Sequence, residues 1–189
     1  MRYKETSGAK IMTQTAENKD SKKHDKTKNK ERETDAKTKR SRDETWTKKN
    51  NELYFGYKLH MLVAGKSSVI LNYSVTTASE HDSQTDLSIS RIVYRDKDYY
   101  RAEPRGIDGT MDKKVKGEDK LPIASIRRIL RISKKRWIVE KPYAVIKSVF
   151  RGGHVLVTRV IRVRVKAMFM CLAHNLSIVL SLQKRELIA

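Results

Sequence analysis

Cysteine and proline are scarce in this sequence. Its 189 residues include one cysteine and three prolines. A single thiol, Cys171, excludes an internal disulfide and any cysteine-based zinc site. Because Cys171 lies in the apolar run MFMCLAHNL, we expect it to be a buried residue with a structural role.

Long uninterrupted apolar runs are also lacking. Arg, Lys and His interrupt the C-terminal hydrophobic stretch, so we expect no segment of membrane-spanning length. The N-terminus has no signal-peptide pattern. These observations predict a soluble, cytoplasmic protein without a membrane partner.

Acidic residues are few, and their distribution is uneven. The chain has 42 Lys and Arg against 22 Asp and Glu, a formal net charge of +20. Residues 121–185 hold fifteen Lys or Arg and one acid, Glu140, which gives +14 for that third of the chain. Such an excess of positive charge favours a polyanionic partner, most simply nucleic acid.

The N-terminal segment is polar. Residues 14–50 contain almost no large apolar side chains and therefore bury too little surface to offset their ordering entropy. We interpret residues 1–50 as a largely disordered segment with a first-strand remnant at 9–15, and residues 51–189 as the folded domain. In an alternative interpretation, the polar segment becomes ordered only against DNA.

The folded part begins with strand patterns. Alternation predicts strands at 53–63 and 69–78 joined as an antiparallel hairpin, and a short buried strand at 92–94 that ends near Asp96. Between them, residues 79–90 have helix-start signals, with Asp82 as the N-cap type. Residues 101–120 are predicted to be a charged loop.

Helical patterns follow. Residues 123–150 are predicted to be helical, with Pro142 either in a first turn or at a kink, and 163–182 form a long apolar helix. The turn GGH at 152–154 separates them. Strand, strand, helix, strand and helices in this order indicate an α/β or α+β domain.

Glu140 is the lone acid of a basic and apolar segment. The spacing R-x3-E-x6-K would align Arg136, Glu140 and Lys147 on one helical face. A carboxylate between two cations suits an acid that holds a metal ion beside phosphates. On spacing alone, an ordinary surface ion pair with Arg136 is the commoner explanation.

Several motifs occur together in a fixed order. YFGYKLHMLV, SVTTASEHDS, YRDKDYY and RWIVEKPYAVIKSVF followed by GGH span about residues 54–182. This order resembles the catalytic domain of DDE-type insertion-sequence transposases. The resemblance implies an α/β, RNase H-like fold, a mixed sheet flanked by helices. It also implies DNA transposition by metal-dependent strand cleavage and joining.

The resemblance assigns roles to individual residues. Asp96 matches the second catalytic acid and Glu140 the third, both as metal ligands for two Mg²⁺ or Mn²⁺ ions. The cations expected to contact DNA are Arg136, Lys141, Lys147 and Arg151. The implied partners are insertion-sequence DNA ends and a second copy in a homodimer, and the implied location is the nucleoid. His60, His81, Asp82 and Asp98 are expected to be structural.

Departures from the family pattern affect the expected activity. The first strand should carry an aspartate, but KIMTQTA has no acid, and the first aspartate of the chain is Asp20. Asp20, Asp25 or Asp35 would have to serve as a substitute at a high entropic cost. In place of the family's DKGY, the chain has Asp96, Lys97, Asp98 and Tyr99.

We therefore expect a truncated copy that binds DNA without sequence preference and does not cleave it. One alternative is a basic nucleic-acid-binding protein that keeps the fold without enzymatic activity. Another is a ribosome-associated, RNA-binding structural protein, which explains the charge and leaves the motif order unexplained.

Overall fold

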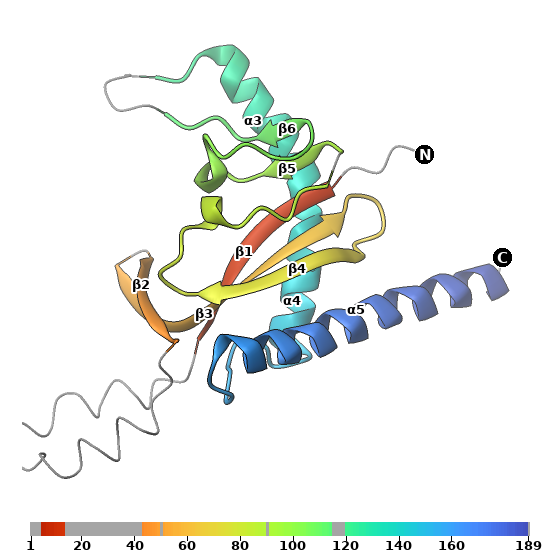
Figure 1. Cartoon of the computed structure of the whole chain (residues 1–189). Helices are drawn as coiled ribbons and strands as arrows, with labels where there is room; N and C mark the ends of the chain where they lie inside the picture. Colours follow the sequence, from red (N-terminus) through yellow and green to blue (C-terminus); the bar gives the residue numbers. More distant parts are fainter. Residues whose placement is uncertain (1–4, 14–42, 50, 90, 115–119, 189) are drawn as a thin grey trace, which may run out of the picture.

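The computed structural model describes residues 5–13, 43–49, 51–89, 91–114 and 120–188 (Figure 1). Within these residues, six strands form one sheet, and three helices pack around it. The strands are β1 (Glu5–Thr13), β2 (Thr45–Lys49), β3 (Glu52–Ala64), β4 (Ile70–Thr77), β5 (Val93–Arg95) and β6 (Asp108–Thr110). The helices are α3 (Ile123–Arg136), α4 (Glu140–Ser148) and α5 (Val160–Ile188), with 3₁₀ turns η1 (Asp82–Gln84), η2 (Lys97–Tyr99) and η3 (Trp137–Val139).

The sheet is mixed, and β1 lies in its interior. β1 pairs with β3 in antiparallel fashion and with β5 in parallel fashion, and β5 pairs in parallel with β6. β3 also forms the expected antiparallel hairpin with β4. Parallel and antiparallel strands flanked by helices confirm the predicted α/β, RNase H-like fold class.

β1 differs from the first-strand remnant expected at 9–15. The strand runs from Glu5 to Thr13, so it begins four residues earlier and ends two residues earlier. β1 and β2 both fall within residues 1–50 and belong to the same sheet as β3. Pairing explains the earlier start, because Glu5 and Thr6 pair with β5 as well as with β3, and paired backbone groups are satisfied there.

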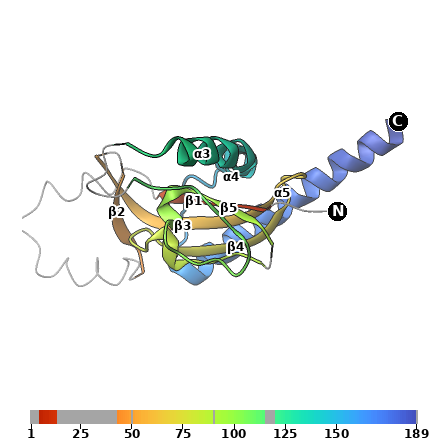
Figure 2. The same cartoon turned by 90° about the horizontal axis from the view of Figure 1, so that it is seen from above.

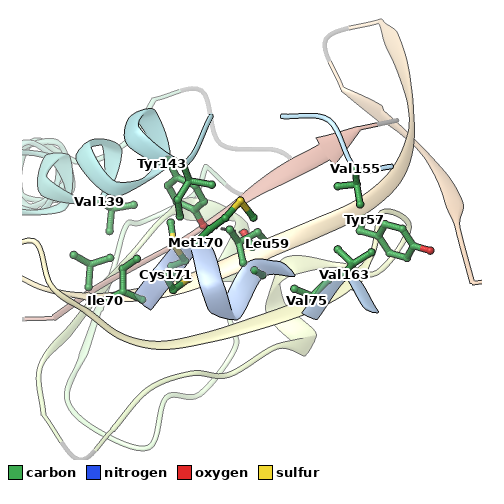
Figure 3. Close-up of a cluster of buried hydrophobic side chains, with 14 residues drawn as sticks. Tyr57, Leu59, Ile70, Val75, Val139, Tyr143, Val155, Val163, Met170 and Cys171 are labelled. Carbon is green, nitrogen blue, oxygen red and sulfur yellow. Dashed lines mark hydrogen bonds between the residues drawn. The ribbon is translucent and has the colours of Figure 1, made fainter. Parts of the chain in front are cut away.

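The main core lies on one face of the sheet (Figure 3). Alternate residues of β3 are fully or almost fully buried, as the period of two in a strand requires. Residues of α4 and α5 pack against them, so both helices cover this face. The β3 members of the core are Tyr57, Leu59, Met61 and Val63. A smaller cluster of Leu62, Leu87 and Val93 forms the core of the opposite face.

The helical region 123–150 is interrupted. α3 ends at Arg136, one 3₁₀ turn follows, and α4 begins at Glu140. Pro142 lies in the first turn of α4, where its missing N–H has no intrahelical partner to lose. The expected tolerance of Pro142 in a first turn is therefore confirmed.

The polar segment 79–90 does not form the expected α-helix. Only the single turn η1 is present, and its N-cap is His81 rather than Asp82. His81 Nδ1 accepts a hydrogen bond from the Ser83 N–H at 3.2 Å. Asp82 is unavailable as a cap because its carboxylate pairs with Lys58 of β3 at 3.0 Å.

α5 is longer than predicted and extends well beyond the sheet (Figures 1 and 2). By length and composition alone, Val160–Lys184 would suffice to cross a membrane, with 22% of its most apolar window buried. The prediction that no apolar segment reaches that length is therefore wrong. Residues 167–183 contain no Asp, Glu, Lys or Arg, because the charges of α5 gather near its two ends.

Candidate DNA-processing site

Asp96 follows directly after β5. Its backbone remains extended, and its side chain caps η2 by accepting a hydrogen bond from the Lys97 N–H at 2.7 Å. This position, at the carboxyl end of a parallel strand next to an interior strand, is where open α/β sheets commonly bind ligands. The next acidic residue, Asp98, is exposed within η2.

Arg136 forms an ion pair with Asp96. Its Nη2 lies 3.2 Å from the Asp96 Oδ2, and the side chains of Arg136 and Asp96 are 20% and 34% exposed. Arg136 Nε is buried and makes no hydrogen bond to any described residue. The guanidinium is therefore directed toward the candidate acid, and its role as a DNA contact stays a prediction.

Glu140 lies one turn beyond Arg136, as the first residue of α4, and is exposed. Tyr143, a buried residue of α4, lies close to this part of the site. Its hydroxyl donates to the Leu59 carbonyl at 2.9 Å, fixing α4 to β3. Burial raises the pKa of Tyr143 well above its usual value, and among the nearby charges Asp82 and Glu140 raise it while Arg136 lowers it. Asp82, Arg136 and Glu140 are therefore among the charged groups that act on this buried hydroxyl.

A second cation–acid pair lies beside this site. Lys58 Nζ is 3.0 Å from Asp82 Oδ1 and also donates to the Glu80 carbonyl at 2.6 Å. The neighbouring His60 is fully buried, with its Nε2 2.9 Å from the Thr76 hydroxyl. Burial lowers the pKa of His60 to about 4, against the opposing charge of Asp82. His60 is therefore neutral near pH 7, in accord with a structural role.

The remaining predicted cations lie on the outer side of α4. Lys141 and Lys147 are exposed within the helix, and Arg151 is exposed just after it. Arg151 has a φ of 50°, the left-handed conformation that ends many helices. The Gly152 N–H bonds to the Ile146 carbonyl at 2.8 Å, which satisfies one of the carbonyls at the end of α4.

A shallow groove runs along the outer side of α3. It has a volume of about 640 Å³ and is lined by Leu130, Arg131, Ser133, Lys134 and Trp137. Trp137 is 68% exposed beside these cations. Trp137 and this groove were not identified as functional from the sequence, although an apolar residue every three or four positions along a basic helix was a visible signal.

The backbone register identifies the β1 position beside Asp96. Thr6 pairs with Tyr94, so continuing the parallel register by two residues brings Gly8 level with Asp96. Gly8 also pairs with Met61, a residue of the main core, which assigns position 8 to the face covered by the helices. Glu5 pairs with Val93, so position 5 belongs to the other face. Glycine thus stands where β1 comes level with Asp96.

Among the described residues, no three His, Cys, Asp or Glu side chains form a group able to hold a metal ion. The three aspartates named as substitute ligands, Asp20, Asp25 and Asp35, lie outside the described residues. The sequence singled out the segments that carry Asp96, Arg136 and Glu140, and the roles of these residues stay predictions. Sequence reasoning missed the pairing of Asp96 with Arg136 and of Asp82 with Lys58, because side-chain partners from distant elements leave no pattern in the sequence.

Comparison with known proteins supplies the family. No curated protein and no solved structure matches the chain. A family model described as the transposase DDE domain matches residues 32–176, which is most of the chain and includes β2 to β6, α3, α4 and much of α5. The chain therefore belongs to the transposase DDE domain family.

Proposed function

We propose that this member of a DNA-transposition family binds DNA and does not cut it. The observation that carries the proposal is the ion pair between Asp96 and Arg136. Transposases of this kind usually depend on divalent metals held by carboxylates. Here a side-chain cation lies where a metal ion would have to contact Asp96.

The described residues do not fit a two-metal site. A divalent ion at Asp96 would have to displace a guanidinium 3.2 Å away and then accept its repulsion. Asp82, the other nearby acid on the sheet side, is already paired with Lys58. Two hard cations need several carboxylate oxygens, and these acids are each committed to a cation.

The register of β1 supports the same conclusion. Gly8 has no side chain to offer beside Asp96, and position 5, the acid of this strand, belongs to the opposite face. The loss of one of three carboxylates removes most of the affinity of such a centre for metal. Two features therefore lower the affinity for metal. Position 8 has no acid, and Arg136 balances the charge of Asp96.

Binding of DNA requires neither metal nor catalysis. Lys141 and Lys147 are exposed on α4 and Arg151 is exposed just after it, and such cations are suited to phosphates. The groove on α3 adds Arg131 and Lys134 around Trp137, a combination of cations and an aromatic face that also suits unpaired bases. This basic surface supports a protein that holds DNA ends.

The direct test combines metal binding with DNA cleavage. We expect calorimetry to detect no site-specific Mn²⁺ binding by the unmodified protein. The Asp96→Asn variant should therefore give the same titration. We also expect no nicking of supercoiled DNA in Mg²⁺ or Mn²⁺, although the same preparation retards DNA in a gel. Metal-dependent nicking by the unmodified protein that disappears in Glu140→Gln would refute the proposal of inactivity.

A gain of function tests the register argument. Gly8→Asp adds a carboxylate level with Asp96, and combining it with Arg136→Gln removes the competing cation. We expect this double variant to bind Mn²⁺ at least tenfold more tightly than the unmodified protein. Ser7→Asp with Arg136→Gln is the matched control, because position 7 belongs to the other face. Equal gains in both would show that the added negative charge, and not its position, is responsible.

A further inference from the structure

α5 is apolar on two opposite sides, and the described residues cover only one of them. The covered side packs on the sheet through Val163, Ala167, Met170 and Cys171, which belong to the main core. The opposite side, which we call the outer stripe, exposes eight large apolar residues with exposed fractions from 39% to 74%. They are Ile161, Val165, Met168, Phe169, Leu172, Leu176, Val179 and Leu180.

The outer stripe is continuous and wide. At about 100° per residue, its members fall within an arc of roughly 120° around the helix axis. That arc is wider than the narrow seam along which two coiled helices meet. Exposed apolar patches of this extent mark interaction surfaces, and a wide arc suits a helix that lies on an extended apolar layer.

The charged residues of α5 surround the outer stripe and have one sign. Residues 160–185 contain five Lys or Arg and no acidic residue. Arg162 and Arg164 are exposed, and the helical period places them about 80° to either side of Leu172, at the two borders of the stripe. Lys184 is exposed near the other end of the helix. The stripe is therefore bordered by cations at both of its ends.

This charge pattern restricts what can cover the stripe. A second α5 does not fit, because cations at both ends would meet cations in either orientation. A layer of anionic lipid supplies negative charge along the whole length of the helix, and each Lys or Arg near such a surface contributes about 1 kcal/mol of attraction. Long cationic side chains also lie along apolar groups while their charged ends reach the headgroups.

The attachment of α5 to the sheet determines how the helix can meet a membrane. Asn175 bonds to both the N–H and the carbonyl of Ile70, each at 2.9 Å, and His174 Nε2 lies 3.0 Å from the Ser68 carbonyl. A membrane-spanning α5 would break these bonds and expose the main core. A helix that lies on the membrane surface through its outer stripe leaves them intact.

We propose that the outer stripe of α5 docks on the surface of an anionic lipid bilayer, with the helix axis parallel to the membrane plane. The apolar side chains enter the boundary between headgroups and acyl chains, and the bordering cations contact lipid phosphates. This proposal departs from the prediction of a protein without a membrane partner, because only the fold shows which side of α5 stays exposed. It does not depend on DNA binding, since the predicted DNA contacts lie on α3, on α4 and just after α4.

Flotation with vesicles tests the docking surface. After nuclease treatment and removal of nucleic acid, we expect the full chain to float with vesicles of equimolar phosphatidylcholine and phosphatidylglycerol. Phe169→Ser with Leu172→Ser should lower the partition coefficient at least tenfold with unchanged helix content. Ile107→Ser with Leu156→Ser, at positions 65% and 87% exposed outside α5, is the matched control and should leave it unchanged. No flotation, or equal flotation of the α5 variant, would overturn the proposal.

A fluorescent label tests which side of α5 meets the lipid. In a Cys171→Ala background, which removes the only native thiol, an environment-sensitive dye is attached at Leu172→Cys or at Leu156→Cys. We expect the emission of the dye at position 172 to shift to shorter wavelength when the vesicles are added, and that at position 156 to stay unchanged. A protein that floats without a shift at position 172 would contradict the proposal. So would a discrete protein oligomer, formed without vesicles, that Phe169→Ser with Leu172→Ser abolishes.

Discussion

Asp96 and Arg136 lie forty residues apart in sequence and form a single ion pair in the fold. Alone, an acid at a strand end next to an interior strand would be a good metal ligand. With a guanidinium 3.2 Å away, its charge is already balanced. The chemistry open to this site is therefore set by which residue reaches Asp96, and not by Asp96 itself.

Arg151 has a backbone conformation that is unfavourable for a residue with a side chain. It occupies the left-handed position of a helix end, where glycine is favoured. We predict that Arg151→Gly raises the free energy of unfolding by ~0.5–1 kcal/mol, because the left-handed strain disappears. If Arg151 contacts phosphate, the same change weakens DNA binding. Urea denaturation and DNA titration measure the two effects, and a stabilised variant with unchanged DNA affinity would exclude the phosphate contact.

His60 makes stability depend on pH. Its pKa falls from the usual 6.5 to about 4 in the folded protein, mainly because it is buried. As the pH falls below 6.5, His60 takes up a proton in the unfolded chain before it does so in the folded protein. The folded state therefore loses free energy of unfolding between pH 6.5 and about 4. We predict a loss of up to about 3 kcal/mol across this window. Denaturation at several pH values should show a shallower decline for His60→Gln than for the unmodified protein.

At the scale of elements, helix ends are set by close contacts with the core. The turn after α4 brings Gly152 against Ile146 and Met170, members of the core layer between α4 and α5. A Cβ added at Gly153, the next residue, would meet the side chain of Lys147. Lack of space therefore requires glycine at position 152, whereas position 153 has room for a methyl group.

We predict that Gly152→Ala destabilises the protein by about 1–3 kcal/mol, because the added methyl group would lie 2.9 Å from the Ile146 carbonyl and 3.0 Å from the Met170 sulfur. Gly153→Ala, whose nearest contact would be the flexible Lys147 side chain at 3.4 Å, should change stability by well under half of that. Thermal denaturation of the two variants provides the comparison. Equal losses would mean that backbone freedom, and not space, determines the sequence of this turn.

At the scale of the whole molecule, the net charge of +20 governs association with polyanions. The predicted DNA contacts of the groove lie on α3, whereas Lys66 is exposed in the turn between β3 and β4 and belongs to neither α3 nor α4. This difference in location supplies a matched pair of substitutions.

We predict that Arg131→Gln with Lys134→Gln makes the plot of log affinity for DNA against log salt less steep, by about 2 units of slope. Each phosphate contact contributes about 0.9 to the steepness. Lys66→Gln should leave the slope unchanged. Fluorescence anisotropy with a short duplex at several salt concentrations gives the slopes. A reduction of similar size in Lys66→Gln would indicate diffuse charge attraction without a defined DNA-binding face.

The sequence by itself determined the periodic elements and the partner class. Alternation in β3 and β4, the apolar spacing in α5 and the excess of cations follow from local physics, because each is a property of neighbouring residues. The motif order also identified the family. The catalytic roles that it assigns to Asp96 and Glu140 stay predictions. The segment 79–90 resisted prediction, since Lys58 from another strand takes the carboxylate that would have capped a helix.

Only the tertiary structure decided what these residues meet. The pairing of Arg136 with Asp96, the alignment of Gly8 with Asp96 and the uncovered side of α5 all depend on contacts between elements far apart in sequence. Such contacts are chosen by sheet register and helix packing. Register in turn follows from burial of whole faces, a property that no single segment contains.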